Sequence, residues 1–350
     1  MGSGNLISAA PTWPPLVRWG KYMEILRSYA EKTIEKARSS LISVSLGLLP
    51  EVVEYQLRYL KRHGRLCNFD NPERLTEKLH HRMRYPLPHF SRLADKVLAR
   101  EYIRDTVGEK FNVPLYGAVE MITASQFEHL PNTFVMKTNN SSGSVRIVPD
   151  KSREDIAALV SLGNSWLRDD FSKCRGERHY KAIRPQVLFE QALLTDAGPP
   201  ADYKIHVFNP AEGDSYLFVQ VINGRFGRMT QNLYSADWQS LPFRLGGTLP
   251  QSTDTAITTA PANLAEMLDV ASRLAQPFGY CRVDLYLFEG HVYVGEITFT
   301  PGAGAFKLYP AEWDRKLGAL FRWPEIPMSG AAEVASERSG HFHNAVNELG

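Results

Sequence analysis

The residues best suited to chemistry lie in the segment RVDLYLFEGHVYVGEITFTPGAG, which begins at Arg282. Side chains alternate between the two faces of a β-strand, so Arg282 shares a face with Asp284, and Glu296 shares one with Thr298. Paired carboxylates are a usual protein contribution to a Mg²⁺ site that substrate phosphates complete. The pattern therefore predicts a magnesium site on Asp284 and Glu296 with Arg282 beside it. An ordinary amphipathic hairpin with a surface ion pair would explain the same residues.

The two acids share a face only if the hairpin has a suitable register. A strict two-residue turn at Glu289-Gly290 puts Asp284 and Glu296 on opposite faces, because side chains alternate with a period of two. We therefore expect a loop of three or five residues, or a β-bulge, in this hairpin. Val292 is expected on the polar face, and the apolar face is expected to hold Val283, Leu285, Leu287, Tyr293, Gly295, Ile297 and Phe299.

A second candidate segment is Phe134–Val148, FVMKTNNSSGSVRIV, in which a strand ends in Lys137 and a loop of small polar residues follows. Backbone N–H groups in such a loop can form an anion-binding nest, and a lysine adds a point charge for a phosphate. The lysine precedes the loop, so the Walker pattern is not matched. A plain hairpin turn is the alternative. The loop residues expected to meet phosphate are Asn140, Ser141, Ser142 and Gly143.

Two further predicted strands carry polar residues at useful positions. Glu190 and Gln191 end the strand Val187–Gln191, where they could meet the edge of a base. Along Asp202–Phe208, Asp202 could accept a ribose hydroxyl and Lys204 could reach a phosphate. Exposed charges on a strand are the alternative for each. His206 shares their face and is expected to be a core or rim histidine rather than a general base.

The segment Gly224–Phe243 is rich in Arg, Gln, Asn, Tyr and Trp. Arg225, Arg228 and Trp238 are candidates for binding an anionic sugar or an amino acid. A polar extension of a hairpin would give the same composition.

Composition excludes several classes of protein. The chain has 350 residues with 40 basic and 38 acidic side chains, a net charge of +2 that is too balanced for a nucleic-acid binder. Three widely spaced cysteines form neither a disulfide framework nor a zinc cluster, which favours a reducing cytoplasm. The apolar run Leu41–Pro50 is too short for a transmembrane span, although peripheral contact of that helix with a membrane remains an alternative to core packing.

Hydrophobic periodicity predicts an α+β chain. Asn223-Gly224 is a strong signal for a two-residue hairpin turn. Helices are expected over Tyr22–Ser39, Val52–Arg62 (ended by Gly64), Arg74–Tyr85, Asp95–Val107, Asp155–Leu167 and 263–275. Strands are expected over Phe134–Lys137, Val145–Val148, Val187–Gln191, Asp202–Phe208, Ser215–Ile222, Phe226–Thr230, Tyr280–Phe288 and Val292–Thr300.

Taken in order, these motifs resemble the ATP-grasp family, and most closely its TupA-like members, typified by teichuronopeptide synthesis. The resemblance rests on Asp95-Lys96, Lys137-Thr138-Asn139, Glu190-Gln191, Asp202, Arg282-x-Asp284 and Glu296-x-Thr298 with Pro301-Gly302. It implies two α+β lobes with antiparallel sheets that clasp ATP, preceded by a helical N-terminal region. Two departures stand out: Thr298 occupies a position where family members carry asparagine, and residues 16–90 look helical where a βαβ domain is usual.

The resemblance also implies a domain organisation. Residues 1–15 would be a disordered N-terminus, 16–110 a helical region, 111–190 the first lobe, 191–325 the second lobe with the metal site, and 326–350 a mobile tail.

The activity implied by the resemblance is ATP-dependent carboxylate–amine ligation through an acyl phosphate, with Mg²⁺. Lys96, Lys137 and Lys204 would neutralise phosphates, Arg282 would stabilise the oxyanion, and Leu193 would join the nucleotide-binding residues. The substrates would be an amine and a small-molecule or polysaccharide-precursor carboxylate such as a uronic acid. The alternatives are a kinase of a sugar or carboxylate, and a non-catalytic nucleotide-binding scaffold at a membrane surface. No oligomeric state is indicated.

Overall fold

The computed structural model describes residues 50–328 apart from 196–197, 225–228, 247–248 and 326. The chain divides into two compact units, Met1–Leu66 and Cys67–Gly350. In the first unit, α2 (Glu51–His63) ends at Gly64, which is left-handed with φ of 71° and donates its N–H to the Leu60 carbonyl, as the sequence predicts. The expected helix Tyr22–Ser39, and almost all of the apolar run 41–50 and of the tail 326–350, lie outside the described residues.

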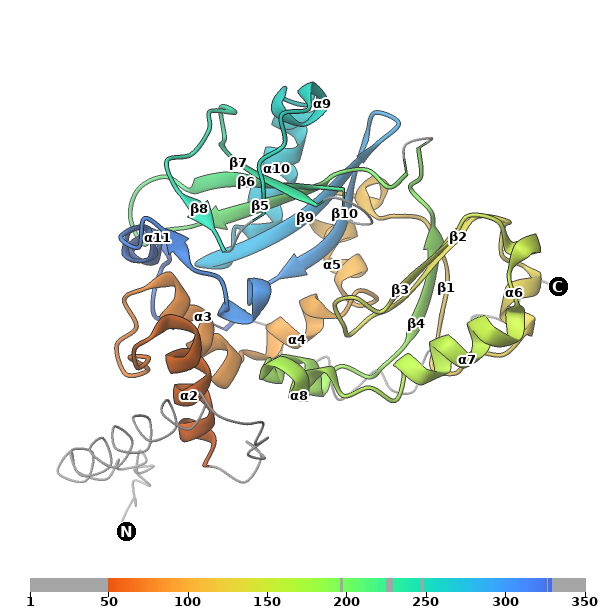
Figure 1. The fold of residues 1–350 in the computed structure, drawn as a ribbon, viewed down its shortest axis with the longest axis horizontal. Helices are drawn as coiled ribbons and strands as arrows, with labels where there is room; N and C mark the ends of the chain where they lie inside the picture. Colours follow the sequence, from red (N-terminus) through yellow and green to blue (C-terminus); the bar gives the residue numbers. More distant parts are fainter. Residues whose placement is uncertain (1–49, 196–197, 225–228, 247–248, 326, 329–350) are drawn as a thin grey trace, which may run out of the picture. The chain divides into compact units, whose positions relative to one another are not determined.

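The described part of the second unit contains two larger antiparallel sheets and one of two strands (Figure 1). The first has the order β1-β4-β2-β3. Its strands are β1 (Leu115–Val119), β2 (Phe134–Thr138), β3 (Val145–Val148) and β4 (Val187–Gln191). One face packs Phe134, Met136 and Phe189 against Phe127 of α6 (Ser125–Glu128) and Leu159 of α7 (Ile156–Trp166). Because strand residues alternate, Val135, Lys137 and Glu190 lie on the opposite face.

The second sheet has the order β10-β9-β5-β6-β7. Its strands are β5 (Asp202–Phe208), β6 (Tyr216–Asn223), β7 (Thr230–Ser235), β9 (Tyr280–Phe288) and β10 (His291–Thr298). Its apolar face includes Ile205, Val221, Val283 and Val294 and forms the largest core. Side chains of α4 (Pro88–Ala94), α5 (Ala99–Thr106) and α10 (Leu264–Ala275) cover that face.

A β-bulge in β10 sets the register of the hairpin that carries the acids. Glu289 and Gly290 both have positive φ and form a tight two-residue turn, so His291 pairs with Phe288. The register then shifts between Val294 and Glu296, which places Glu296 opposite Asp284. The expected bulge is therefore confirmed.

The bulge also corrects two assignments of side chains to faces. Before it, Val292 pairs with Leu287 and lies in the core, whereas Tyr293 pairs with Tyr286 on the polar face. The predictions for Val292 and Tyr293 were wrong because the alternation of β10 side chains between the two faces shifts by one residue at Gly295. A Cβ on Gly295 would lie 2.5 Å from Cε2 of Tyr286, so the close approach of this ring leaves no room for a side chain.

The polar face of the second sheet is closed at one end by a second core. Phe208, Phe218 and Tyr280 pack there with Leu79 of α3 (Leu75–Arg84) and Leu317 of α11 (Trp313–Leu320). The two-stranded sheet of β8 (Arg244–Leu245) and β11 (Leu308–Tyr309) covers the same end. The remaining elements are α8 (Phe171–Arg175), α9 (Thr255–Thr258) and the 3-10 turns Glu109–Phe111, Lys151–Arg153, Arg178–Ala182 and Pro301–Gly304.

Three predicted local structures differ from the observed ones. The single helix expected over Asp95–Val107 is broken, because the Asp95 carboxylate accepts the N–H of Val97 at 2.8 Å and forms a turn before α5 begins at Ala99. The two-residue turn expected at Asn223-Gly224 is replaced by a longer connection, since Asn223 pairs with Thr230. The strand expected over Phe226–Thr230 is wrong, because β7 begins at Thr230, and residues 226–228 lie outside the described ones. Strands β1, β8 and β11 and helix α11 were not predicted. No helix in the described ranges has the length and apolarity needed to cross a membrane.

Arg82 of α3 ties the ends of β9 and β10 together from within the core. Its guanidinium donates to the carbonyls of Tyr280 and Phe299, both at 2.7 Å, and pairs with Glu325. It also lies over the ring of Phe321, 4.4 Å from the centroid. The side chain is 1% exposed, so its charge depends on these partners.

We predict that Arg82→Met lowers the free energy of unfolding by about 3–5 kcal/mol, because it leaves a buried carboxylate and two carbonyls without their donor. Urea unfolding would measure the loss. Arg146→Met is the matched control, since Arg146 pairs with Glu154 at the surface and its loss is expected to cost about 1 kcal/mol or less. Equal losses for the two variants would contradict this role for Arg82.

Candidate active site

A buried ion cluster lies on the polar face of the second sheet. Arg282 donates through Nε and Nη2 to the two oxygens of Asp284, at 2.6 and 2.8 Å. Lys204 lies directly opposite Asp284 in the β5–β9 ladder and bonds to Oδ2 of the same carboxylate. Burial raises the pKa of the Asp284 carboxyl, but these two cations outweigh it and lower the pKa to about 2. Asp284 is therefore charged, and both of its oxygens are bonded to a cation.

Glu296 and Thr298 complete this part of the site from β10. Glu296 pairs with Asp284 in the ladder, and Thr298 pairs with Arg282, which donates to the Thr298 hydroxyl at 3.2 Å. No described Lys or Arg nitrogen forms an ion pair with Glu296. Directly opposed strand residues have Cβ atoms roughly 4.5–5.5 Å apart, so the two carboxylates can meet at one cation. Among the described residues, Asp284 therefore has two cations within ion-pair distance and Glu296 has none.

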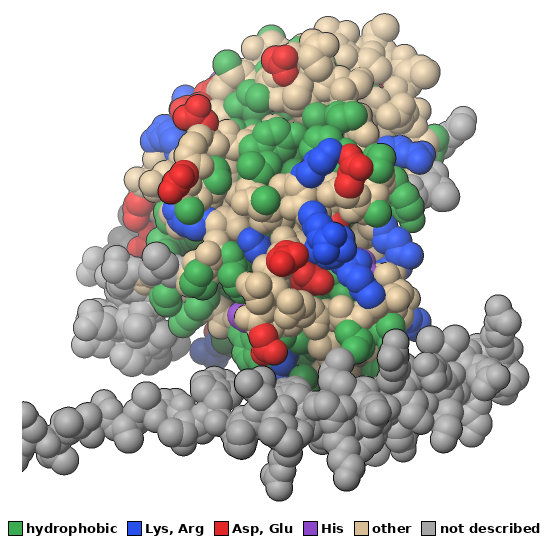
Figure 2. Space-filling view, turned by 90° about the vertical axis from the view of Figure 1, so that its left-hand side faces the viewer, with side chains coloured by type: hydrophobic (Ala, Val, Ile, Leu, Met, Phe, Trp, Pro, Cys, Tyr) green, Lys and Arg blue, Asp and Glu red, His purple; other side chains and the backbone are tan. Residues whose placement is uncertain are grey.

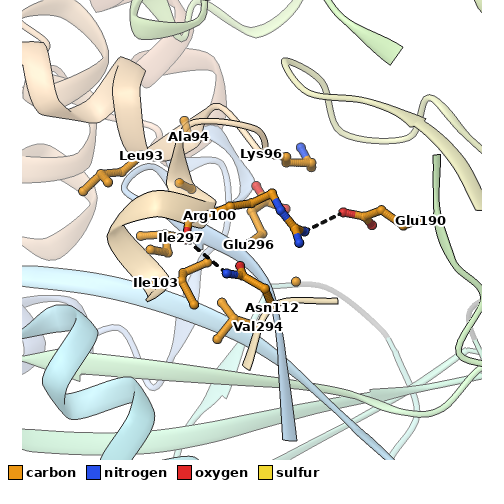
Figure 3. A pocket seen from close by; sticks show the side chains of 12 residues that line it. Leu93, Ala94, Lys96, Arg100, Ile103, Asn112, Glu190, Val294, Glu296 and Ile297 are labelled. Carbon is orange, nitrogen blue, oxygen red and sulfur yellow. Dashed lines mark hydrogen bonds and ion pairs between the residues drawn. The ribbon is translucent and has the colours of Figure 1, made fainter. Parts of the chain in front are cut away.

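Lys96 approaches the same region from the turn between α4 and α5. Figure 3 shows it near Arg100, Glu190 and Glu296, around a small pocket that all four line. Its ammonium donates to the Ser141 carbonyl at 2.9 Å, and burial lowers its pKa. Lys96 thus contacts the polar loop through that loop's backbone.

The loop after β2 is fixed by Asn139, which is fully buried. Its amide nitrogen donates to Asp95 at 3.0 Å and to the Arg184 carbonyl at 2.9 Å, and its oxygen accepts the N–H of Gln186 at 2.8 Å. Asn140 is also buried, and Ser141 hydrogen-bonds through its hydroxyl to Thr138. Ser142 and Gly143 are exposed, and Gly143 has φ of 105°, which favours glycine.

Lys137 and Glu190 face one another across β2 and β4. The Lys137 ammonium lies 2.5 Å from one oxygen of Glu190, and Arg100 lies 3.5 Å from the other. The Glu190 carboxylate is therefore held by two cations. The backbone N–H of Gln191 donates to the Pro114 carbonyl at 2.9 Å.

A cavity of about 500 Å³ lies between residues of the two sheets. That volume is within the range of small-molecule sites. The first sheet lines it with Val135, Val145 and Ile147, and the second lines it with Ile222 and Tyr286. Predicted nucleotide residues that line it are Lys137, Glu190, Gln191, Leu193 and Asp202. Lys137, Glu190 and Gln191 belong to the first sheet and Asp202 to the second. Asp202 lies two residues from Lys204 on the same face of β5.

Trp238, the predicted substrate residue that the structure describes, does not line this cavity. The ring of Trp238 stacks on Tyr234 with 4.3 Å between centroids, and its indole N–H donates to the Thr258 carbonyl. Arg225 and Arg228 lie outside the described residues. On the face shown in Figure 2, acidic and basic side chains lie beside one another among hydrophobic ones.

His206 lies in the sheet rather than at a reactive position. Its ring stacks on Phe218 and hydrogen-bonds to the Tyr280 hydroxyl at 2.8 Å and to Gln220 at 3.2 Å. Burial lowers its pKa to about 3, so it is neutral. This agrees with the expectation of a core histidine.

Glu177 was missed in the sequence. It lies just before the 3-10 turn Arg178–Ala182 and accepts a hydrogen bond from the Thr300 hydroxyl at 2.5 Å. Burial, with a smaller contribution from Glu296, raises its pKa to about 7. The irregular segment around it has no periodicity that would have pointed to the site. Arg100 and Tyr286 were also not predicted as site residues. Each looks in the sequence like an ordinary surface residue of an amphipathic helix or strand.

The donor set suits a hard divalent cation. Asp284, Glu296 and the Thr298 hydroxyl supply oxygen ligands from two adjacent strands, and Mg²⁺ usually takes one or two carboxylates plus phosphate and water. The described residues contain no group of three or more His, Cys, Asp or Glu side chains placed to hold a metal. Two carboxylates and a hydroxyl would leave the other positions of such a cation to phosphate and water.

Comparison with solved structures finds similar proteins at low identity. D-alanine–D-alanine ligase from Helicobacter pylori is 14% identical, with a TM-score of 0.41, and the match covers 65% of this chain and 61% of that one. The ligase from Bacillus anthracis complexed with ATP is 16% identical, with a TM-score of 0.36 and coverage of 66% and 65%. N5-carboxyaminoimidazole ribonucleotide synthetase from Thermus thermophilus is 12% identical, with a TM-score of 0.37 and coverage of 71% and 52%. This chain thus spans under two thirds of the length of each of these proteins.

A search of curated proteins finds no significant match. A family model described as TupA-like ATPgrasp matches residues 77–322, which is more than half of the chain and includes both sheets and the ion cluster. The chain belongs to the TupA-like ATP-grasp family.

Proposed function

We propose that this protein is an ATP-dependent carboxylate–amine ligase. The observation that carries the proposal is the position of the ion cluster beside the cavity. Lys204 and Asp284 lie two residues along their strands from Asp202 and Tyr286, which line the cavity, and Lys137 and Glu190 line its other wall. A nucleotide in the cavity would have its base near β4 and its phosphates directed toward the acids. Family membership supports the same orientation.

In the proposed reaction, an oxygen of the substrate carboxylate attacks the γ-phosphorus of ATP, and the bond from phosphorus to ADP breaks. The acyl phosphate is then attacked by the amine nitrogen, the carbon–oxygen bond to phosphate breaks, and the amine loses a proton to solvent. Mg²⁺ would supply charge neutralisation for the phosphates. Asp284, Glu296 and Thr298 would hold it, and Lys96, Lys137 and Lys204 would contact phosphate oxygens.

Arg282 is the proposed oxyanion donor. Its planar guanidinium is fixed by Asp284 and Thr298, and such a preorganised donor stabilises developing negative charge without reorganising. Asp202, at the cavity wall, is proposed to accept a ribose hydroxyl. Hydrophobic side chains of β2 and β3 would contact the base, with Gln191 and Leu193 at its edge.

The substrate class follows from the family resemblance. We propose a uronic acid or another carboxylate of a surface-polysaccharide precursor, an amine or amino acid as the acceptor, and a cytoplasmic site of action. Cys67 and Cys281 are buried thiols, and neither forms a disulfide among the described residues, which fits a reducing compartment.

We predict that replacing both acids, Asp284→Asn with Glu296→Gln, lowers kcat for ADP formation by at least about 100-fold, because charge stabilisation at the phosphates is lost. A coupled ADP assay would measure it. Glu312→Gln is the matched control, since Glu312 is exposed and pairs only with Lys316 among described cations. Full turnover in the double variant would exclude the assigned site.

The ligase also predicts a dependence on two substrates. ADP and phosphate should appear together only when a uronic acid or related carboxylate and an amine are both present, since the amine releases the phosphate. Phosphate release measured over a panel of carboxylates and amines tests this. A stable phosphorylated product without amine would instead support a kinase, and absence of turnover with nucleotide bound would support a scaffold.

A further inference from the structure

The ion cluster presents an obstacle to the cation that the site is proposed to hold. Both oxygens of Asp284 are already bonded, to Arg282 and to Lys204. The four groups Asp284, Glu296, Arg282 and Lys204 have a formal charge of zero together. A divalent cation arriving alone therefore meets two positive charges at one of its two carboxylates and gains little net attraction.

The two cations that hold Asp284 are not equally replaceable. Arg282 makes a two-point contact with Asp284 and a third with Thr298, so its planar fork is fixed in place. Lys204 makes its ion pair with Asp284 through a single ammonium on a flexible stem. Lys204 is therefore the partner that can leave.

The place to which Lys204 can move is the cavity. Asp202 and Tyr286 form the next same-face pair along the β5–β9 ladder, and both line the cavity wall. Two residues along a strand span about 7 Å, which is within reach of a lysine side chain. A polyphosphate in the cavity would thus offer the Lys204 ammonium a more highly charged partner than Asp284.

We infer that Lys204 blocks the metal site until a nucleotide binds: it occupies Asp284 in the free protein and is drawn away by the phosphates, so that metal and nucleotide bind cooperatively. This inference rests on the proposed nucleotide site. Cooperativity of this kind is reciprocal, so each ligand raises the affinity for the other by the same factor. The residue thereby prevents the site from filling with metal alone.

The test uses the full-length protein and Mn²⁺ as the probe, with free Mn²⁺ followed by electron paramagnetic resonance. Without nucleotide, Lys204→Met should bind Mn²⁺ at least about tenfold more tightly than wild type, within the usual 5–150-fold range of coupling between sites. Lys204→Gln serves if the methionine variant does not fold. Lys204→Arg retains the charge and should bind Mn²⁺ no more tightly than wild type. Lys110→Met removes a lysine from an exposed pair with Glu266 and should leave the affinity unchanged.

A second readout measures the cooperativity itself. The affinity for a non-hydrolysable ATP analogue, with and without saturating Mn²⁺, should rise by a larger factor in wild type than in Lys204→Met. The Mn²⁺ complex of the analogue in solution contributes equally to both proteins. Unchanged Mn²⁺ affinity in Lys204→Met and Lys204→Gln, with analogue binding intact, would overturn the inference and leave the proposed function standing. Failure of every variant and of wild type to bind the analogue would overturn the proposed function as well.

Discussion

One backbone irregularity, the bulge at Gly295, determines whether this protein has an active site of the kind described. The hairpin turn at Glu289-Gly290 alone would direct Glu296 away from Asp284 into the apolar core. The bulge inserts one extra residue, so every side chain after it is on the opposite face from the one it would otherwise take. Both acids therefore lie on the polar face, while Val294 and Ile297 stay in the core. Bulges beside active sites commonly re-aim a side chain in this way.

The polar face that results changes character along its length. Aromatic residues around Tyr280 pack beneath α3 and α11 at one end. Neutral groups come next, with His206 bonded to Gln220, and then the ion cluster at Asp284. The cavity begins at Tyr286. Burial at the first end excludes water from one side of the ions, which strengthens their interactions, whereas the cavity leaves the other side open to a ligand.

Much of this arrangement was predictable from local sequence. Strands β3, β4, β5 and β9 have the bounds that the sequence predicts, because each is a short run rich in β-branched and aromatic residues with Gly, Pro, Asn or Ser near its ends. The bulge was predictable only as a condition for two carboxylates to meet, since glycine alone does not specify it. The partners of individual side chains were harder to predict from the sequence. The contacts of Glu190 with Lys137 and Arg100, and of Glu177 with Thr300, join segments that are far apart in the chain. The turn at Asp95 was missed because a local side-chain hydrogen bond replaced a helical turn.

In the proposed site, Asp284 and Glu296 together hold a cation beside a nucleotide. A crystal structure of the protein with Mn²⁺ and a non-hydrolysable ATP analogue tests it most directly, with the ion located by its anomalous signal. We expect one ion at about 2.0–2.2 Å from an oxygen of each carboxylate, with the base in the cavity lined by Val135 and Ile147. An ion bound to the phosphates without contact to either acid, or a nucleotide outside that cavity, would contradict it.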